Sequence, residues 1–234
     1  MSVSQSRKTL LIVGASRGLG HAMAEEFLAR GWNVLGTVRG GSRGRLHELS
    51  ERSAGRLEIE TLDITVPEQI RALRSRLAAR KFDMLFVSAG ITNNPRETIG
   101  EVSTEEFVRV MVTNALSPMR VVEALHDLVS ADGTLGVMSS GQGSVANNTG
   151  GQREVYRASK AALNTLMRSF AARHVDDRRA MVLMAPGWVR TDMGGPDGRL
   201  SIEESIPNVV STLLAAQGTP GLRYLDYLGR TVPW

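Results

Sequence analysis

Residues 9–20 read "TLLIVGASRGLG", and this stretch carries the strongest indication of the fold. Its first part, "TLLIV", is apolar on both faces after the threonine, which is typical of a strand buried in a parallel sheet. Glycines follow at 14, 18 and 20, and apolar residues then recur at helical spacing over 18–30. A buried strand, a glycine-rich turn and a helix in this order predict the first βα unit of an α/β fold.

The same alternation continues along the chain. Further strands are predicted over 33–38, 57–62, 83–88, 134–139 and 180–185, and further helices over 44–53, 66–79, 104–129 and 155–173. Since neither a linker nor a repeat divides the chain, we predict one domain over residues 1–234. The expected fold is a doubly wound (Rossmann) parallel sheet of about seven strands with helices on both faces.

Several polar residues and prolines predict where helices begin or break. Thr65 with Glu68, and Ser103 with Glu106, have the spacing of capping boxes at two helix starts. Pro118 falls inside the long fourth helix, where it removes a backbone donor. We therefore expect a kink or a short break at that point.

Composition excludes several classes of protein. The formal net charge of +4 comes from 28 basic and 24 acidic residues that are interspersed, which gives little support for nucleic-acid or membrane partners. Cysteine is absent, and the four histidines form no spaced metal pair, so we predict no metal site. The apolar run after Lys8 ends at Val13, too short for a signal sequence or a bilayer span. We expect a cytoplasmic protein.

The glycine turn has the spacing G-x-x-x-G-x-G. A pyrophosphate bound between a strand and a helix requires a tight turn, close backbone approach and a helix N-terminus directed at the anion. Gly14 would form the turn, and Gly18 and Gly20 would allow the close approach, with Ser16 and Leu19 beside them. The alternative is an ordinary glycine-rich βα turn.

The second strand indicates which dinucleotide would bind. An acidic residue at its end would bind the 2′-hydroxyl of NAD, but this strand ends with Val38 and Arg39. Guanidinium groups bind phosphate, and Arg17 in the glycine turn could reach the same 2′-phosphate. The two arginines predict NADP(H), unless they are ordinary surface charges.

The third strand ends at Asp63 and Ile64, which have two possible roles. Asp63 could accept a hydrogen bond from the adenine amine, with Ile64 contributing its backbone. Asp63 could instead begin the turn before Thr65. We favour the ligand role.

The pentapeptide "YRASK" at 156–160 pairs two scarce residue types, because lysine occurs only three times in the chain and so does tyrosine. Tyr156 and Lys160, four residues apart, project from one face of a helix. The ammonium would lower the pKa of the phenol toward the range of a general acid/base. An exposed aromatic–cation pair is the alternative, but arginine would serve there equally well.

Polar residues near two other predicted element ends could complete a catalytic group. Ser139 and Ser140 follow the fifth strand, where open α/β sheets bind ligands, and a serine hydroxyl there could donate to a carbonyl oxygen. Asn114, near the break expected at Pro118, could hold a water against Lys160. It could also be a solvent-facing helix residue.

At this point the chain resembles the short-chain dehydrogenase/reductase family. The matching motifs are "GASRGLG" at 14–20, Asp63, Asn114, "SSGQG" at 139–143, "YRASK" at 156–160 and "PGWVRT" at 186–191. The resemblance implies that Tyr156 is the proton donor, that Lys160 binds the nicotinamide ribose, that Ser140 positions the substrate oxygen and that Asn114 belongs to a proton relay. It also implies that the cofactor contacts Ala89, Gly90, Pro186, Gly187, Val189 and Thr191.

The resemblance extends to the last residues, and "YRASKAALN", "APGWVRTDMGG" and "LDYLGRTVPW" are similar to the C-factor-like carbonyl reductases. It implies a homodimer or a homotetramer. Ser88 stands where the family usually has asparagine, which affects a backbone-bridging role and not the chemistry. Ser140 and Tyr156 are separated by slightly more residues than is common, and Ser139 and Ser144 are weaker candidates for the catalytic hydroxyl.

We therefore predict an NADP(H)-dependent oxidoreductase that moves a hydride between nicotinamide and a small carbonyl compound or secondary alcohol, with reduction as the favoured direction. The alternative is a dinucleotide-binding sensor with little or no turnover. Residues 191–205 are expected to form a flexible lid. The pocket lining would include Trp188, Met193, Val145 and Asn147, among which no charged group selects a substrate class.

Overall fold

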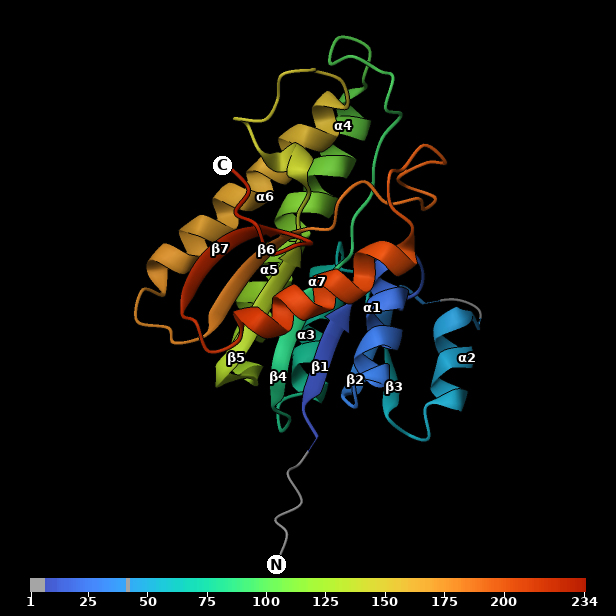
Figure 1. Cartoon of the computed structure of the whole chain (residues 1–234), viewed down its shortest axis with the longest axis vertical. Helices are drawn as coiled ribbons and strands as arrows, with labels where there is room; N and C mark the ends of the chain where they lie inside the picture. The colour runs from blue at the N-terminus through green and yellow to red at the C-terminus, as the bar shows by residue number, and fades with distance from the viewer. Residues whose placement is uncertain (1–6, 41–42) are drawn as a thin grey trace, which may run out of the picture.

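The computed structural model describes residues 7–40 and 43–234, and it contains a seven-stranded sheet in which every neighbouring pair is parallel. The strand order is β3-β2-β1-β4-β5-β6-β7. The chain therefore winds in one direction from β1 to β3 and in the other from β4 to β7. This arrangement confirms the predicted doubly wound fold (Figure 1).

The predicted strands agree closely with the observed ones. The strands are β1 (Thr9–Val13), β2 (Asn33–Val38), β3 (Leu57–Thr61), β4 (Phe82–Val87), β5 (Val129–Met138), β6 (Ala180–Ala185) and β7 (Gly221–Asp226). β5 begins five residues before the apolar run that predicted it. Its first half, "VSADG", is mostly polar and partly exposed, so hydrophobicity did not mark it.

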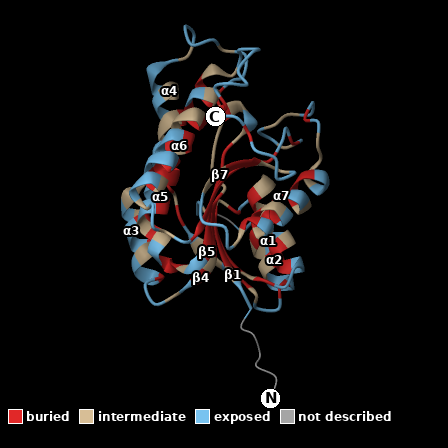
Figure 2. Ribbon diagram, turned by 60° about the vertical axis from the view of Figure 1, so that its left-hand side comes forward, coloured by how far each residue is buried: buried red, intermediate tan, exposed pale blue. Residues whose placement is uncertain are grey.

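Helices cover both faces of the sheet (Figure 2). They are α1 (Gly18–Ala29), α2 (Arg45–Arg52), α3 (Pro67–Arg76), α4 (Thr104–Met111), α5 (Ser117–Leu125), α6 (Glu154–Arg173) and α7 (Ile202–Ala216). α1 packs against α2 and α7 on one face, while α5 packs against α3 and α6 on the other. Two buried apolar clusters, one under each helical layer, fill the space between helices and sheet. None of the described helices is both long and apolar enough to cross a membrane.

The long fourth helix is interrupted, as Pro118 predicted. α4 passes into a π-helical turn over Val112–Leu116, and α5 then starts at Ser117 with the proline in its first turn. A π turn leaves backbone groups out of the regular α-helical pattern, so it accommodates the missing donor of the proline. Asn114 lies in the middle of this turn.

Two local predictions need correction. Thr65 does not cap a helix: α3 starts later, with Val66 at its N-cap, and the Thr65 hydroxyl donates instead to Asp63 at 2.6 Å. Ser103 does cap α4, but Glu106 pairs with Arg109.

The predicted lid is also too long. Residues 201–205 belong to the start of α7, where Ser201 and Glu204 form a capping box that the sequence reading overlooked. Only residues 191–200 remain as a loop, and its two ends are joined by a bridge between Val189 and Leu200.

Candidate active site

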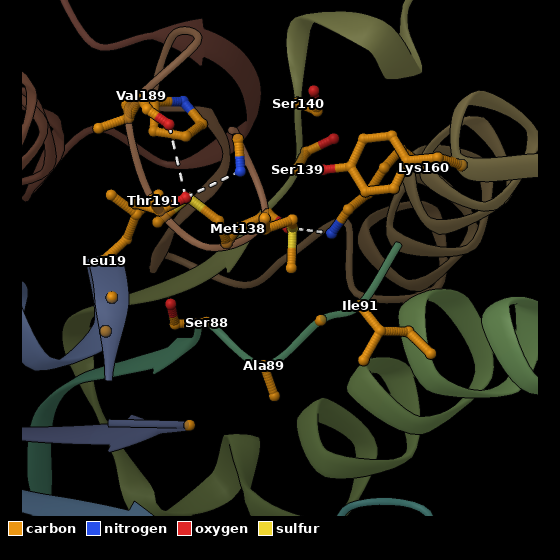
Figure 3. A pocket seen from close by; sticks show the side chains of 18 of the residues that line it. Leu19, Ser88, Ala89, Ile91, Met138, Ser139, Ser140, Lys160, Val189 and Thr191 are labelled. Carbon is orange, nitrogen blue, oxygen red and sulfur yellow. Dashed lines mark hydrogen bonds between the residues drawn. The ribbon is translucent and has the colours of Figure 1, made fainter. Parts of the chain in front are cut away.

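The carboxyl ends of the strands surround one large cavity of about 780 Å³. It lies where the strand order reverses between β1 and β4, the usual ligand position in open α/β sheets. With one exception, every residue predicted to bind cofactor or to act in catalysis lines this cavity. The exception is Asn114, which is buried behind it. Segments that are far apart in the sequence therefore form a single site (Figure 3).

The glycine turn needs its glycines at two positions. Gly14 has a φ of +90°, and a Cβ there would lie 2.7 Å from the backbone nitrogen of Ala89. A Cβ on Gly20 would lie 2.1 Å from the carbonyl oxygen of Gly14. The first turn of α1 thus sits directly on the ends of β1 and β4. This close packing leaves a cradle of backbone groups at a helix N-terminus that fits a pyrophosphate.

Arg17 and Arg39 both line the end of the cavity near the glycine turn. Arg17 pairs with Asp192 of the loop after β6 at 2.9 Å, but both side chains are largely exposed, so the pair adds little to stability. The guanidinium of Arg39 has no hydrogen bond or ion pair with the part of the chain that the structure describes. Arg39 is therefore available to a phosphate at this end, and Arg17 could exchange its weak surface pair for one.

Asp63 combines the two roles that the sequence left open. Its Oδ1 accepts hydrogen bonds from the backbone and the hydroxyl of Thr65, so it does form the turn after β3. The residue also lines the cavity together with Ile64. The turn fixes one carboxylate oxygen and leaves the other for a ligand.

Ser88 lies under the glycine turn, with its hydroxyl 3.1 Å from the position that a Cβ on Gly20 would take. Its backbone nitrogen donates to the carbonyl of Val13, and that of Ala89 donates to the same oxygen. Backbone hydrogen bonds thus join β1 to β4 at this point. The small serine fits beneath α1 without the amide that the family usually has there.

Lys160 is a buried ammonium without a carboxylate partner among the residues that the structure describes. Only 3% of the residue is exposed, and its Nζ donates to the carbonyl oxygen of Met138 at 2.9 Å (Figure 3). Burial lowers the pKa of Lys160 to about 8. At neutral pH the group is still mainly charged, and two of its three donors remain for a ligand. This is the arrangement expected of a residue that binds ribose hydroxyls.

Tyr156 lies one helical turn from Lys160, whose Nζ is 5.9 Å from the centroid of the phenol ring. The prediction that lysine lowers the pKa of this tyrosine needs correction. Burial raises the pKa of Tyr156, and the Ser140 hydroxyl and the charge of Arg153 only partly oppose that effect. The phenol is therefore neutral at physiological pH, the state that a proton donor requires.

Ser140 is the serine positioned for chemistry. Its hydroxyl contacts Tyr156 and also accepts a hydrogen bond from the backbone of Gln142 at 3.1 Å. Ser139 instead donates to Asn164 at 2.6 Å within the buried interior. Ser144 accepts from the backbone of Asn147 and turns the following loop. The three serines thus separate into one at the phenol and two with structural partners.

Asn114 is placed by the π turn against the end of β4. Its amide donates to the carbonyl of Ile91 and to the hydroxyl of Ser159, while its Oδ1 accepts from the backbone of Ile91 at 2.8 Å. The residue is fully buried, which excludes the solvent-facing alternative. Its Oδ1 and the Nζ of Lys160 lie 3.4 and 3.5 Å from the position that a Cβ on Gly90 would take, and Oδ1 has a second lone pair that accepts no hydrogen bond from the described residues. A relay water would have to bind at this lone pair.

The segment after β6 closes the other side of the cavity. The hydroxyl of Thr191 accepts from the backbone of Gly194 at 3.0 Å, and the indole of Trp188 donates to the carbonyl of the same glycine at 2.7 Å. Gly187, with a φ of +87°, allows the sharp turn out of the strand. The loop is therefore a compact unit held by its own hydrogen bonds.

Among the residues predicted to line the substrate end, Trp188, Met193 and Asn147 do so. Val145 does not: it is 73% exposed and borders a second hollow beside Trp234. The loop after β5 turns outward before it reaches α6, which carries Val145 away from the phenol.

Two functional candidates escaped the sequence reading. Arg153 lines the cavity three residues before Tyr156, so a charged group does face the substrate end. The available signal was a basic residue just before the predicted start of the helix that carries the tyrosine. Tyr224 in β7 donates a hydrogen bond to the carbonyl of Ser140 and so fixes the serine from below. No local pattern connects positions 140 and 224, which are joined only by the sheet.

Within residues 7–40 and 43–234, no group of three or more His, Asp or Glu is arranged to hold a metal.

Comparison with known proteins identifies the class. A family model described as short chain dehydrogenase matches residues 8–199. The chain thus belongs to the short-chain dehydrogenase/reductase family, an oxidoreductase family, as the sequence predicted.

Individual relatives narrow the comparison. A short-chain dehydrogenase/reductase from Burkholderia multivorans, crystallised with NADP, is 67% identical, with a TM-score of 0.96 over 97% of this chain and 100% of that one. A carbonyl reductase from Pseudomonas aeruginosa PAO1 in complex with NADP is 38% identical, with a TM-score of 0.89 over 98% of this chain and all of that one. C-signal of Myxococcus xanthus is 34% identical and covers 70% of this chain and all of its own length. These relatives confirm the predicted C-factor-like carbonyl reductase branch.

Proposed function

We propose that this short-chain dehydrogenase/reductase is an NADPH-dependent carbonyl reductase. The observation that carries the proposal is the junction of Ser140, a neutral Tyr156 and a carboxylate-free Lys160 at the wall of one cavity. NADP in the crystals of two relatives supports the choice of cofactor.

Each residue of the site has a separate role in the proposed reaction. The hydroxyls of Ser140 and Tyr156 donate hydrogen bonds to the substrate oxygen, and the phenol gives up its proton as that oxygen gains negative charge. Lys160 holds the ribose hydroxyls and provides a positive charge near the phenolate that results. Asn114 holds a water from which the proton is replaced. NADPH supplies the hydride when it is bound.

The cofactor would be held along the strand ends. We assign the pyrophosphate to the turn from Gly14 to Gly20 and the 2′-phosphate to Arg17 and Arg39. Asp63 and Ile64 would contact the adenine. The nicotinamide would lie against residues of the β4 and β6 ends, namely Ala89, Gly90, Pro186, Gly187, Val189 and Thr191.

The wider setting is also part of the proposal. We infer one domain over 1–234, a homodimer or homotetramer, and a place in the cytoplasm, where the NADP pool is kept reduced. Exposed apolar side chains on α4, the π turn, α6 and the C-terminal residue are consistent with contacts between copies: Val108, Leu116, Leu166 and Trp234. The sensor alternative is disfavoured, because binding a dinucleotide does not require a buried tyrosine with a serine hydroxyl beside it at the same wall.

The cofactor preference gives a direct test of the proposal. NADPH should bind at least tenfold more tightly than NADH in fluorescence titrations, since two guanidinium groups can bind the 2′-phosphate. Arg39→Ala should reduce that ratio with little change for NADH. A preference for NADH would refute the roles given to Arg17 and Arg39. Oxidation of NADPH by a panel of aldehydes, quinones and diketones would establish turnover, and inactivity with all of them would favour a sensor.

A further inference from the structure

The backbone just before α6 is unusual. Gly151, Gln152 and Arg153 have φ values of +61°, +57° and +52°, so three successive residues are left-handed and two of them are not glycine. Such conformations are costly and are found where the surrounding structure imposes them, often at functional sites. Here the Nε of Arg157 donates to the carbonyls of Gly151 and Gln152, at 3.1 and 2.9 Å. Helix α6 thus holds Arg153 in a fixed place.

Arg153 is half-buried and lines the cavity, yet in the described chain its guanidinium makes no hydrogen bond and no ion pair. Three other arginines of the lining are paired with carboxylates: Arg17 with Asp192, Arg109 with Glu106 and Arg230 with Asp226. Arg39 lies at the end assigned to the 2′-phosphate. Arg153 is therefore the arginine at the α6 end of the site that has no carboxylate partner among the described residues.

Arg153 also lies close to the reacting group. It is the N-cap residue of α6, three residues before Tyr156, and both residues line the same cavity. Its charge acts to lower the pKa of the phenol against the effect of burial. α6 covers one face of the sheet, whereas α1, which carries the glycine turn, covers the other (Figure 2). An anion at Arg153 would thus belong to the substrate and not to the cofactor phosphates.

We propose that Arg153 binds a carboxylate of the substrate, so that the protein reduces small carbonyl compounds that carry a carboxylate group. This inference rests on the proposed function and specifies its substrate class. Guanidinium and carboxylate form two parallel charge-assisted hydrogen bonds, which orient a ligand as well as attract it. With the carboxylate held there, the carbonyl of a short substrate lies within reach of the Tyr156 and Ser140 hydroxyls.

Matched probes test the charge alone. 3-Formylbenzoate and 4-formylbenzoate have the same ring and aldehyde as their methyl esters but carry one negative charge. For the better acid, kcat/KM with NADPH should exceed that of its ester at least tenfold. Arg153→Gln should abolish this advantage and change the ester less than threefold. Glutamine is compatible with the backbone, since Gln152 already adopts the same left-handed conformation.

Further variants separate binding from structure. Arg153→Lys should restore part of the preference, because the charge remains without the planar fork. Arg120→Gln, which removes an exposed arginine of α5 remote from the cavity, should leave both substrates unchanged. An equal loss for acid and ester in Arg153→Gln would overturn the inference, since it would mean that Arg153 acts only through Tyr156.

The two proposals can fail separately. If the esters are reduced and the acids show no advantage, the inference is wrong and the carbonyl reductase remains. If no probe is reduced, calorimetric titration of 4-formylbenzoate into the protein with NADP⁺ decides the matter. Binding that weakens at least tenfold in Arg153→Gln would support the anion site, and absence of binding would contradict it. The proposed function is then decided separately by the wider panel of aldehydes, quinones and diketones.

Discussion

Each end of the sheet contains a buried cation, and the two cations differ in their partners. At the amino end, Arg179 is 8% exposed, and its Nε lies 2.8 and 2.9 Å from the two carboxylate oxygens of Asp177. It also contacts the ring and the backbone of His126. At the carboxyl end, Lys160 is 3% exposed and has one carbonyl oxygen as its partner.

A buried charge is costly unless it is paired. The protein supplies the pair at the amino end, so Arg179 serves the architecture by fixing the segments that enter β5 and β6. At the carboxyl end no carboxylate of the described residues approaches Lys160, so the cost of burial is only partly offset by the carbonyl of Met138 until a ligand binds. The contrast assigns stability to one end of the sheet and chemistry to the other.

The largest expected effect tests the chemistry at the carboxyl end. Tyr156→Phe removes the proton donor while keeping the ring, so turnover with NADPH and a carbonyl substrate should fall about 10³-fold. NADPH affinity should remain within a few fold, because the phenol hydroxyl belongs to the substrate side. Steady-state kinetics and fluorescence titration measure the two quantities. Turnover that stays at the wild-type level would remove Tyr156 from the reaction.

The next effect concerns the amino end. Asp177→Asn leaves the guanidinium of Arg179 buried without its counter-charge, which should lower the free energy of unfolding by about 3 kcal/mol. Chemical denaturation measures this loss. Turnover at a temperature well below the transition should be unchanged, since the site lies at the opposite end of the strands. Asp176→Asn, one residue away and exposed, is the control and should have little effect on either property. Stability equal to the wild type would show that the pair is not structural.

Lys160→Met should give the opposite result. Burial lowers the lysine pKa from 10.5 to about 8, which at ~1.4 kcal/mol per pKa unit corresponds to about 3 kcal/mol. Loss of the hydrogen bond to Met138 costs about 1 kcal/mol, so replacing the charge should stabilise the fold by about 2 kcal/mol. Turnover should be lost. A destabilised Lys160→Met would mean that the hydrogen bond to Met138 outweighs the buried charge.

The lowered pKa of Lys160 also predicts how the free energy of unfolding changes with pH. Between pH 8 and 10.5 the unfolded chain binds more protons at Lys160 than the folded one, so its contribution to stability rises with pH. This rise should be present in the wild type and absent in Lys160→Met.

The same contrast explains what the sequence could predict. Strands such as 9–13 and 180–185 have a local pattern that already fixes their burial, and motifs such as "YRASK" lie within one helix. β7 has a mixed pattern because only two of its six residues are fully buried at the sheet edge. α7 was not predicted, because Pro207 lies inside it and a glycine-rich loop precedes it.

Contacts between residues that are distant in the sequence could not be predicted from local sequence patterns. Tyr224 reaches Ser140 because β7 and β5 flank β6, which is a property of the sheet order. Arg179 and Asp177 are two residues apart, but their burial comes from contact with His126, 53 residues away. The raised pKa of Tyr156 likewise depends on burial, which the lysine spacing alone did not reveal.

The smallest expected effect is the pH dependence of stability caused by His126 at the amino end of the sheet. Burial and then the charges of Arg179 and His174 lower the pKa of His126 below 6.5, against weaker opposing effects of Asp127 and Glu123. The unfolded chain therefore binds a proton at His126 first as the pH falls, so stability should decrease below about pH 6.5. The pKa of Asp177 lies below 3.8, so its own contribution is lost only in stronger acid.

Denaturation between pH 7.5 and 5 should show a decrease smaller than the effect of Asp177→Asn. His126→Gln keeps a hydrogen-bond acceptor for Arg179 and does not titrate, so it should remove most of that decrease. A decrease that persists unchanged in His126→Gln would place the acid sensitivity elsewhere. The amino end would then be stabilised by the Arg179–Asp177 pair alone, without a contribution from the neutral imidazole.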